Sequence, residues 1–160
     1  MTEPAGRRWA SYRSAVVDLF PPGARPLRVH QRPGPPGVFP AGLEEPAFVL
    51  TACNPGSAPL GDAANRARQA ELVAALAAAF CRWWQAVGWD LSSDHREDSV
   101  LVVGLTEDEA VALGRRFGQE ALYGWTRRSW SVVSCVDDRR DESGWSLSEP
   151  EDAVARPLPL

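Results

Sequence analysis

Polar residues follow an apolar run near the end of the first third of the chain, and their types could hold a small ligand. The apolar run at 47–50 leads into a polar turn at 51–57, and further polar residues open the helix expected from residue 62. The end of a strand beside the start of a helix is a common position for ligand-binding groups. The residues that we predict to bind a ligand here are Thr51, Asn54, Ser57, Asn65, Arg68 and Gln69.

These side chains favour a small, polar and anionic ligand, either a metabolite or a nucleotide-like molecule. The planar guanidinium of Arg68 suits a phosphate or carboxylate, and the start of a helix attracts an anion. Asn65, Arg68 and Gln69 extend the core-facing stripe of the helix, where an amide without a partner costs about 1–3 kcal/mol. Two interpretations stay open: these side chains hold the 54–61 loop in place, or they meet the ligand.

Glu97 is the candidate general acid or base. It precedes an apolar segment at 99–104, and a carboxyl group near apolar surface can have its pKa raised towards neutrality. A surface position or an ion pair with an arginine is the alternative. Cys53 and His95 could imitate a thiol hydrolase, but Asn54 directly follows Cys53 and is badly placed to orient a distant imidazole.

The composition restricts the class of protein. The 160 residues suit a single domain, and the chain contains no lysine, which excludes a lysine-dependent phosphate loop or Schiff base. Abundant Ala, Gly, Pro and Arg indicate a GC-rich bacterial genome. Three widely spaced cysteines and two histidines form no metal-ligand pattern, so we expect neither a metal nor a cofactor.

The net charge of −4 resides in residues 137–160, which leaves residues 1–136 neutral. A neutral body lacks the basic footprint of a general nucleic-acid binder. No apolar stretch approaches the roughly 20 residues that a membrane span needs. We therefore expect a cytoplasmic protein without membrane contact, built as one domain at 1–136 and a disordered acidic tail at 137–160.

The elements that must position these residues follow from periodicity and turn signals. Strand signals occur at 12–20 and 27–29, at 47–53, at 99–104, and at 120–125 and 130–135. A helix is expected from Asp62 to about Val87, and another after Thr106, which begins a Thr-x-x-Glu capping box and ends near Gly118. Because strand pairs stand at both ends, we predict an α+β fold: an antiparallel or mixed sheet with two main helices on one face.

Several landmarks together resemble the bacterial domain-of-unknown-function family numbered 3293. They are Phe48-Val-Leu-Thr-Ala-x-Asn54-Pro-x-Ser57, Asn65 and Gln69 before Leu72, Glu97-x-Ser99 before a valine-rich strand, and Phe117-Gly-Gln119-x-Ala121. The resemblance covers roughly residues 12–125. It implies no particular activity, but it adds Gln119 to the predicted ligand-binding residues.

The sequence thus leads to one expected function and two alternatives. The first is binding of a small polar or anionic ligand at the strand-to-helix corner, residues 51–69. The second is a hydrolase or transferase that uses Glu97 as general acid or base in the same pocket, with Asn54, Ser57 and Gln119 orienting the substrate. The third is a protein-interaction module, in which tryptophan-rich surface and the acidic tail would contact a partner.

Overall fold

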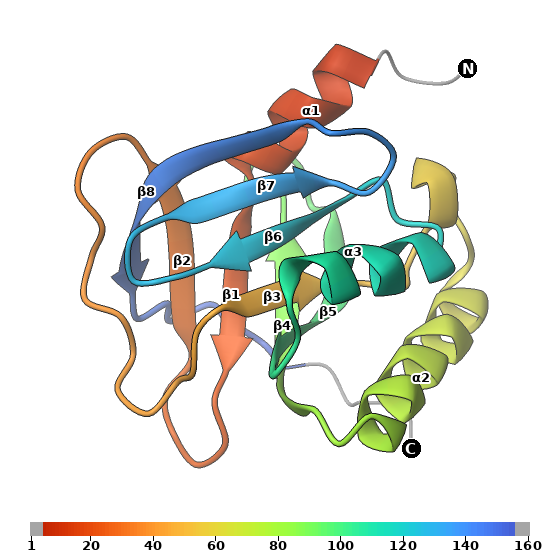
Figure 1. Ribbon diagram of the computed structural model, residues 1–160, viewed down its shortest axis with the longest axis horizontal. Coiled ribbons are helices and arrows are strands. Elements are labelled where there is room, and N and C mark those ends of the chain that lie inside the picture. The colour runs from red at the N-terminus through yellow and green to blue at the C-terminus, as the bar shows by residue number, and fades with distance from the viewer. Residues whose placement is uncertain (1–4, 156–160) are drawn as a thin grey trace.

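Eight strands form one closed antiparallel barrel (Figure 1). The computed structural model describes residues 5–155, with side chains from Arg8 onward. The order around the barrel is β1-β2-β8-β7-β6-β3-β5-β4, and β4 pairs with β1 to close the ring. In chain order the strands are β1 Val16–Phe20, β2 Leu27–Arg32, β3 Ala47–Leu50, β4 Arg82–Trp89, β5 Arg96–Val103, β6 Ala121–Trp125, β7 Trp130–Ser134 and β8 Arg140–Ser148.

The predicted open or mixed sheet with two main helices on one face is wrong, because the sheet closes on itself. One strand that closes it, β4, occupies residues expected to be helical. The helix α2, Asp62–Ala78, ends earlier, and Phe80 beyond it has φ 57°, a left-handed conformation that cannot continue a helix. In β4 the side chains of Trp84 and Ala86 reach the barrel interior at every second residue, which is strand periodicity.

The other unexpected strand, β8, lies inside the segment 137–160 that was expected to be a disordered tail. Its alternate residues Trp145 and Leu147 pack into the barrel interior, and β8 pairs with both β2 and β7. The folded part of the chain therefore extends past the expected boundary at residue 136. The last five residues, 156–160, lie outside the described residues.

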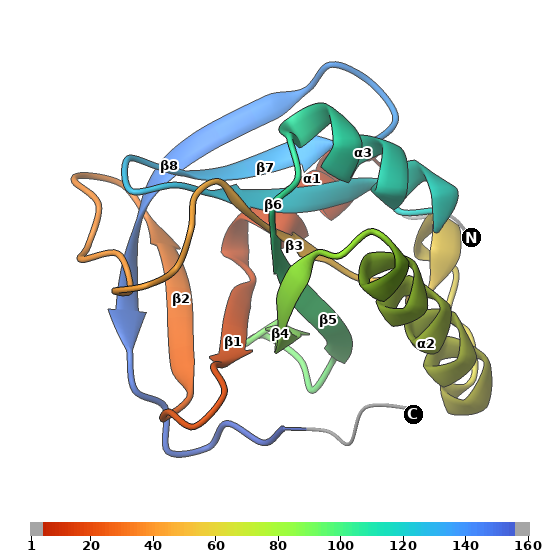
Figure 2. The same cartoon turned by 60° about the horizontal axis from the view of Figure 1, so that its bottom comes forward.

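The helices lie outside the barrel wall. α2 and α3, Glu107–Arg116, lie beside each other against the strands, and α1, Ala5–Ser14, precedes β1 (Figure 2). A short 3-10 turn, η1, spans Pro55–Ser57. The helix α1 was not predicted from the sequence. None of the helices in residues 5–155 combines the length and the apolar character needed to cross a bilayer.

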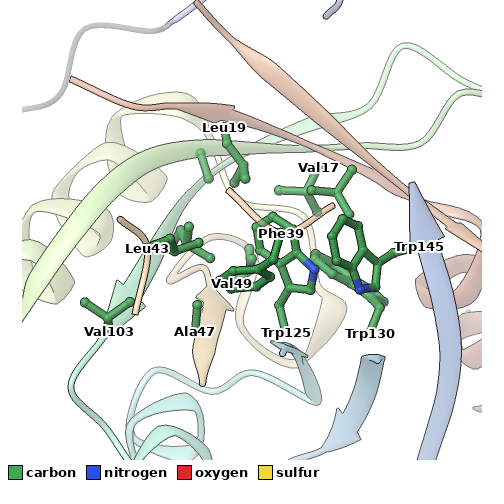
Figure 3. Packing of buried hydrophobic residues seen from close by; sticks show 13 residues of the cluster. Val17, Leu19, Phe39, Leu43, Ala47, Val49, Val103, Trp125, Trp130 and Trp145 are labelled. Atoms are coloured by element: carbon green, nitrogen blue, oxygen red, sulfur yellow. The ribbon is translucent and has the colours of Figure 1, made fainter. Parts of the chain in front are cut away.

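Two apolar cores result from the alternation of side chains along the strands. The interior core contains three fully buried tryptophans, Trp125, Trp130 and Trp145, together with Phe39 from the loop between β2 and β3 (Figure 3). The outer core lies between the strands and the helices α2 and α3, and its buried residues include Phe48, Leu72 and Ala110. Both faces of β3 are therefore covered, as its unbroken apolar run predicts.

The predicted start of α3 is confirmed. The Thr106 side chain accepts a hydrogen bond from the Glu109 backbone N–H, and the Glu109 carboxylate accepts one from Thr106, both at 3.2 Å. We expect Thr106→Ala to lower the free energy of unfolding by about 1 kcal/mol, because an amide of the first turn loses its partner. Urea unfolding measures this, and Ala112→Ser at an exposed position of α3 serves as the control.

Candidate functional site

The predicted site residues meet at one end of the barrel. In an antiparallel ring of this order, the starts of β1, β5, β6 and β8 lie at the same end as the last residues of the other four strands. The turn at 51–57 follows β3 there, and Glu97 stands near the start of β5. The helix α1 lies at this end as well, since the Tyr12 carbonyl accepts hydrogen bonds from Gln31 of β2 at 2.7 Å and from the Tyr123 hydroxyl of β6 at 2.9 Å.

Glu97 faces the inside of the barrel. Ser99 and Leu101 lie on the same side of β5, and Leu101 belongs to the interior core. Asn54 Nδ2 donates to Glu97 Oε1 at 2.8 Å, and His95 Nε2 lies 3.2 Å from the same oxygen. The Glu97 side chain is 27% exposed and that of His95 59%. One carboxylate oxygen is thus fixed by an amide and an imidazole, while Oε2 accepts no hydrogen bond from the side chains of residues 8–155.

A second set of contacts borders Glu97. Ser57 Oγ donates to Glu120 Oε2 at 3.1 Å, and Arg8 Nη1 donates to Glu120 Oε1 at 3.1 Å. The Tyr12 hydroxyl forms a hydrogen bond with Ser57, and burial is the largest reason that the pKa of Tyr12 is raised, with the Glu120 and Glu97 charges acting in the same direction. Four separate parts of the chain therefore place polar side chains at this end of the barrel.

The turn at 54–57 has an unusual backbone. Asn54 and Ser57 both have positive φ, at 48° and 59°, as does Gly56 between them. Such conformations cost about 1–3 kcal/mol outside glycine and persist where surrounding contacts impose them. Here Asn54 N donates to Asn65 Oδ1 at 2.9 Å, and Asn54 Oδ1 accepts from the Leu60 N–H and from Asn65 Nδ2, both at 2.9 Å.

The remaining predicted residues bind main chain. Arg68 donates to the carbonyls of Ala52 and Phe117. Ala52 N donates to Gln69 Oε1 at 3.0 Å, Gln119 Nε2 donates to the Cys53 carbonyl at 2.9 Å, and Thr51 Oγ1 donates to the Asp98 carbonyl at 2.7 Å. These contacts hold the 51–54 segment against α2 and β5. Of the two interpretations left open for the buried amides, the contacts favour stabilisation of this loop.

The family described as "Protein of unknown function (DUF3293)" matches residues 50–122. The resemblance to family 3293 is confirmed. The matched DUF3293 segment begins at the end of β3 and finishes in β6, so it contains Asn54, Ser57, Glu97 and Glu120 but not α1. No curated protein and no solved structure matches the chain.

Two contributors to the site, Arg8 and Tyr12, lie outside the DUF3293 segment and were missed. Arg8 and Tyr12 are four residues apart, so both lie on one face of a helix. Their grouping could have been predicted from the sequence only if α1 had been predicted first. Glu120, within the DUF3293 segment, was also missed because it lies beside Gln119 at the start of β6 and carries no motif.

Three backbone N–H groups at residues 56–58 donate hydrogen bonds to carbonyl groups of the protein itself. Gly56 N donates to the Gly118 carbonyl at 2.7 Å, Ser57 N to the Asn54 carbonyl at 3.0 Å and Ala58 N to the Pro55 carbonyl at 3.2 Å. A cradle for an anion needs several free N–H groups pointing at one spot. This turn does not supply such a cradle.

Cys53 is poorly suited to be a nucleophile. Burial is the main cause that raises the pKa of its thiol from 9.0 to about 11. Cys135 is also buried, and its pKa is likewise raised to about 11. Because the thiolate is the reactive form, these values argue against the thiol hydrolase arrangement with His95.

We expect iodoacetamide at pH 8 to alkylate half-buried Cys81 before Cys53 or Cys135. Burial raises the pKa of all three thiols, but Cys53 and Cys135 are buried, whereas Cys81 is partly exposed to solvent and to the reagent. Mass spectrometry of quenched time points measures the three rates, and the denatured protein serves as the control in which the rates should converge. Alkylation of Cys53 first in the folded protein would contradict the burial that the structure gives it.

Proposed function

We propose that the protein binds a small polar ligand at the end of the barrel next to α1, with Glu97 as its principal contact. The observation that carries this proposal is the inward-facing Glu97 carboxylate, whose Oε1 is fixed by Asn54 and His95 while Oε2 stays available. Small barrels commonly hold ligands at their open ends, and a pre-oriented acceptor there gives binding specificity.

The contacts of Glu97 differ from those that the fold needs. Arg68, Gln69 and Gln119 saturate main-chain groups, which is sufficient reason for their presence. Glu97 instead contacts the side chains of Asn54 and His95 at the end of an otherwise apolar interior, and taking a carboxylate partly out of water there is unfavourable for folding. Residues that lower stability in this way are often retained for function.

The ligand should present hydrogen-bond donors such as hydroxyl or amino groups. Glu97 Oε2 is an acceptor, and the Tyr12 hydroxyl can accept as well as donate. Arg68 was expected from the sequence to bind an anionic ligand, but the Arg68 guanidinium donates its hydrogen bonds to two main-chain carbonyls. The Arg8 guanidinium is paired with Glu120. We therefore propose a neutral or cationic polar metabolite in place of an anionic one.

A thermal-shift screen tests this proposal. We expect members of a panel of amines, amino acids, sugars and nucleosides to raise the melting temperature of the wild-type protein, and Glu97→Gln to abolish the shift while the variant remains folded. Glu71→Gln, at an exposed position of α2, is the matched control and should respond as the wild type does. A panel without any hit, or hits that Glu97→Gln leaves unchanged, would refute a site at Glu97.

A second candidate function is acid–base catalysis by the same groups. The supporting observation is the 3.2 Å contact between His95 Nε2 and Glu97 Oε1, because a carboxylate that orients an imidazole is a common arrangement for proton transfer. In a hydrolase or transferase, His95 would take a proton from water or from a substrate hydroxyl. We expect His95→Gln then to remove turnover of a screened substrate while binding persists. Equal turnover in the variant would exclude this role.

A further inference from the structure

A charged pair on the outside of the barrel is buried although its strands turn it away from the interior. In β1 the residues Val17 and Leu19 face the interior core, so Asp18 between them points outward, as Arg28 does in β2. Their side chains are nevertheless only 2% and 10% exposed. Arg28 Nε and Nη2 donate to the two Asp18 oxygens at 2.6 and 2.9 Å, so the pair is complete within the barrel wall.

The chain that follows β8 lies over this pair. The segment 149–155, which we term the strap, runs past the lower ends of β2 and β1 in both views (Figures 1 and 2). Asp152 Oδ1 lies 3.1 Å from Arg28 Nη2, and Glu149 Oε2 lies 3.6 Å from Arg25 Nη1. The strap has the sequence Glu-Pro-Glu-Asp-Ala-Val-Ala, with three acidic residues and no basic one.

The surface next to the strap combines basic and aromatic groups. The Arg28 guanidinium carbon lies 4.4 Å from the Trp89 ring centroid, and that of Arg96 lies 3.9 Å from it. We term Arg28, Trp89 and Arg96 the arginine–tryptophan surface. Guanidinium groups held on an indole ring lose little freedom when they bind a carboxylate, which favours recognition of acidic groups.

The strap is attached by weak ion pairs. Asp152 is 58% exposed, and both members of the Arg25–Glu149 pair are largely exposed. Such pairs contribute about 0–1 kcal/mol each. Release of the strap leaves the Asp18–Arg28 pair intact, so no unpaired charge remains buried. The barrel therefore does not depend on these two contacts.

We propose that the strap is displaceable and that the arginine–tryptophan surface binds an acidic peptide segment of a partner protein in its place. The choice of occupant follows from what the surface holds in the structure, an acidic segment without regular secondary structure whose Asp152 carboxylate contacts Arg28. Charge complementarity agrees, since all the charged side chains of the strap are acidic and the surface offers guanidinium groups. The strap then acts as an internal competitor, and a partner segment must be present in excess or bind more tightly.

The test uses the full chain and a fluorescently labelled peptide with the sequence of residues 149–155. We expect Asp152→Asn to strengthen binding of this peptide about five-fold, because a weakened internal competitor leaves more of the surface free. Glu151→Gln is the matched control: it removes one charge from the strap at an exposed position that forms no ion pair among the described residues, and it should leave the affinity unchanged. A peptide with Asn in place of its Asp should bind more weakly to both variants.

NMR relaxation of the same proteins reports the strap itself. We expect lower order parameters for the amides of residues 151–155 in Asp152→Asn than in the wild type, with unchanged order parameters in β7. Equal peptide affinity in the two proteins together with unchanged order parameters would overturn the proposal and make the strap a fixed part of the fold. Equal binding of a scrambled peptide of the same composition would also overturn it, because the surface would then respond to charge alone.

Discussion

Arg28→Met should lower the free energy of unfolding by about 3–5 kcal/mol. The substitution leaves the Asp18 carboxylate almost fully buried without the guanidinium that balances its charge. Removing one partner of a buried ion pair has a cost of this size. Burial is what makes the effect large, since the same change at an exposed pair would cost about 1 kcal/mol or less. Urea unfolding followed by tryptophan fluorescence measures the loss.

The double variant Asp18→Leu/Arg28→Met is the control for this prediction. Replacing both charges by apolar groups removes the unpaired carboxylate, so we expect most of the lost stability to return. If Arg28→Met alone costs less than about 1 kcal/mol, water reaches Asp18 and the pair is not buried as described.

Trp125→Ala should lower the free energy of unfolding by about 3–5 kcal/mol. Trp125 is fully buried in the barrel interior, where its ring centroid lies 4.7 Å from that of Phe39 and 5.0 Å from that of Trp145 (Figure 3). Truncation leaves a large cavity that the closed wall of strands cannot easily collapse to fill. Thermal or urea unfolding measures the change.

Phe80→Ala is the matched control for the loss of an aromatic side chain. Phe80 is 94% exposed, so its removal should change the free energy of unfolding by about 0.5 kcal/mol or less. A similar small effect at Trp125 would contradict the tightly packed interior and would indicate that the barrel is loosely filled.

The parts of the fold that depend on local sequence signals could be predicted. The hairpins β1–β2 and β6–β7 follow from apolar and β-branched runs separated by turns, and the start of α3 follows from the Thr106 capping box. Each of these signals lies within about ten residues. Local propensity and turn chemistry are sufficient to fix them.

Closure of the barrel could not be predicted, because it depends on two ambiguous segments. In β4, Trp83 and Val87 are spaced by four and therefore fit a helix, although the segment pairs with β1 and β5. The left-handed residue that separates α2 from β4 is Phe80, whereas glycine is the residue that usually marks such a position. In β8 the many acidic residues of the segment suggested a disordered tail, although Trp145 within it is fully buried in the interior.

The contacts of the predicted site residues could be foreseen only in part. Asn54 and Glu97, which were assigned to the same candidate site from the sequence, contact each other directly. Arg68 and Gln69 were expected to meet a ligand, but both bind the main chain of Ala52, and Arg68 also binds the Phe117 carbonyl, partners that no sequence pattern specifies. Tyr12 was read as part of a strand, so its approach to Ser57 required knowledge of α1.

The most direct test of a ligand site at Glu97 is an NMR titration of the 15N-labelled wild-type protein with the compound that gives the largest thermal shift. We expect the amide shifts to concentrate at Tyr12, at 54–57 and at 95–98, and Glu97→Gln to remove them. Shifts concentrated at the hollow lined by Leu43, Arg82 and Trp83, at the opposite end of the barrel, would refute a ligand site at Glu97.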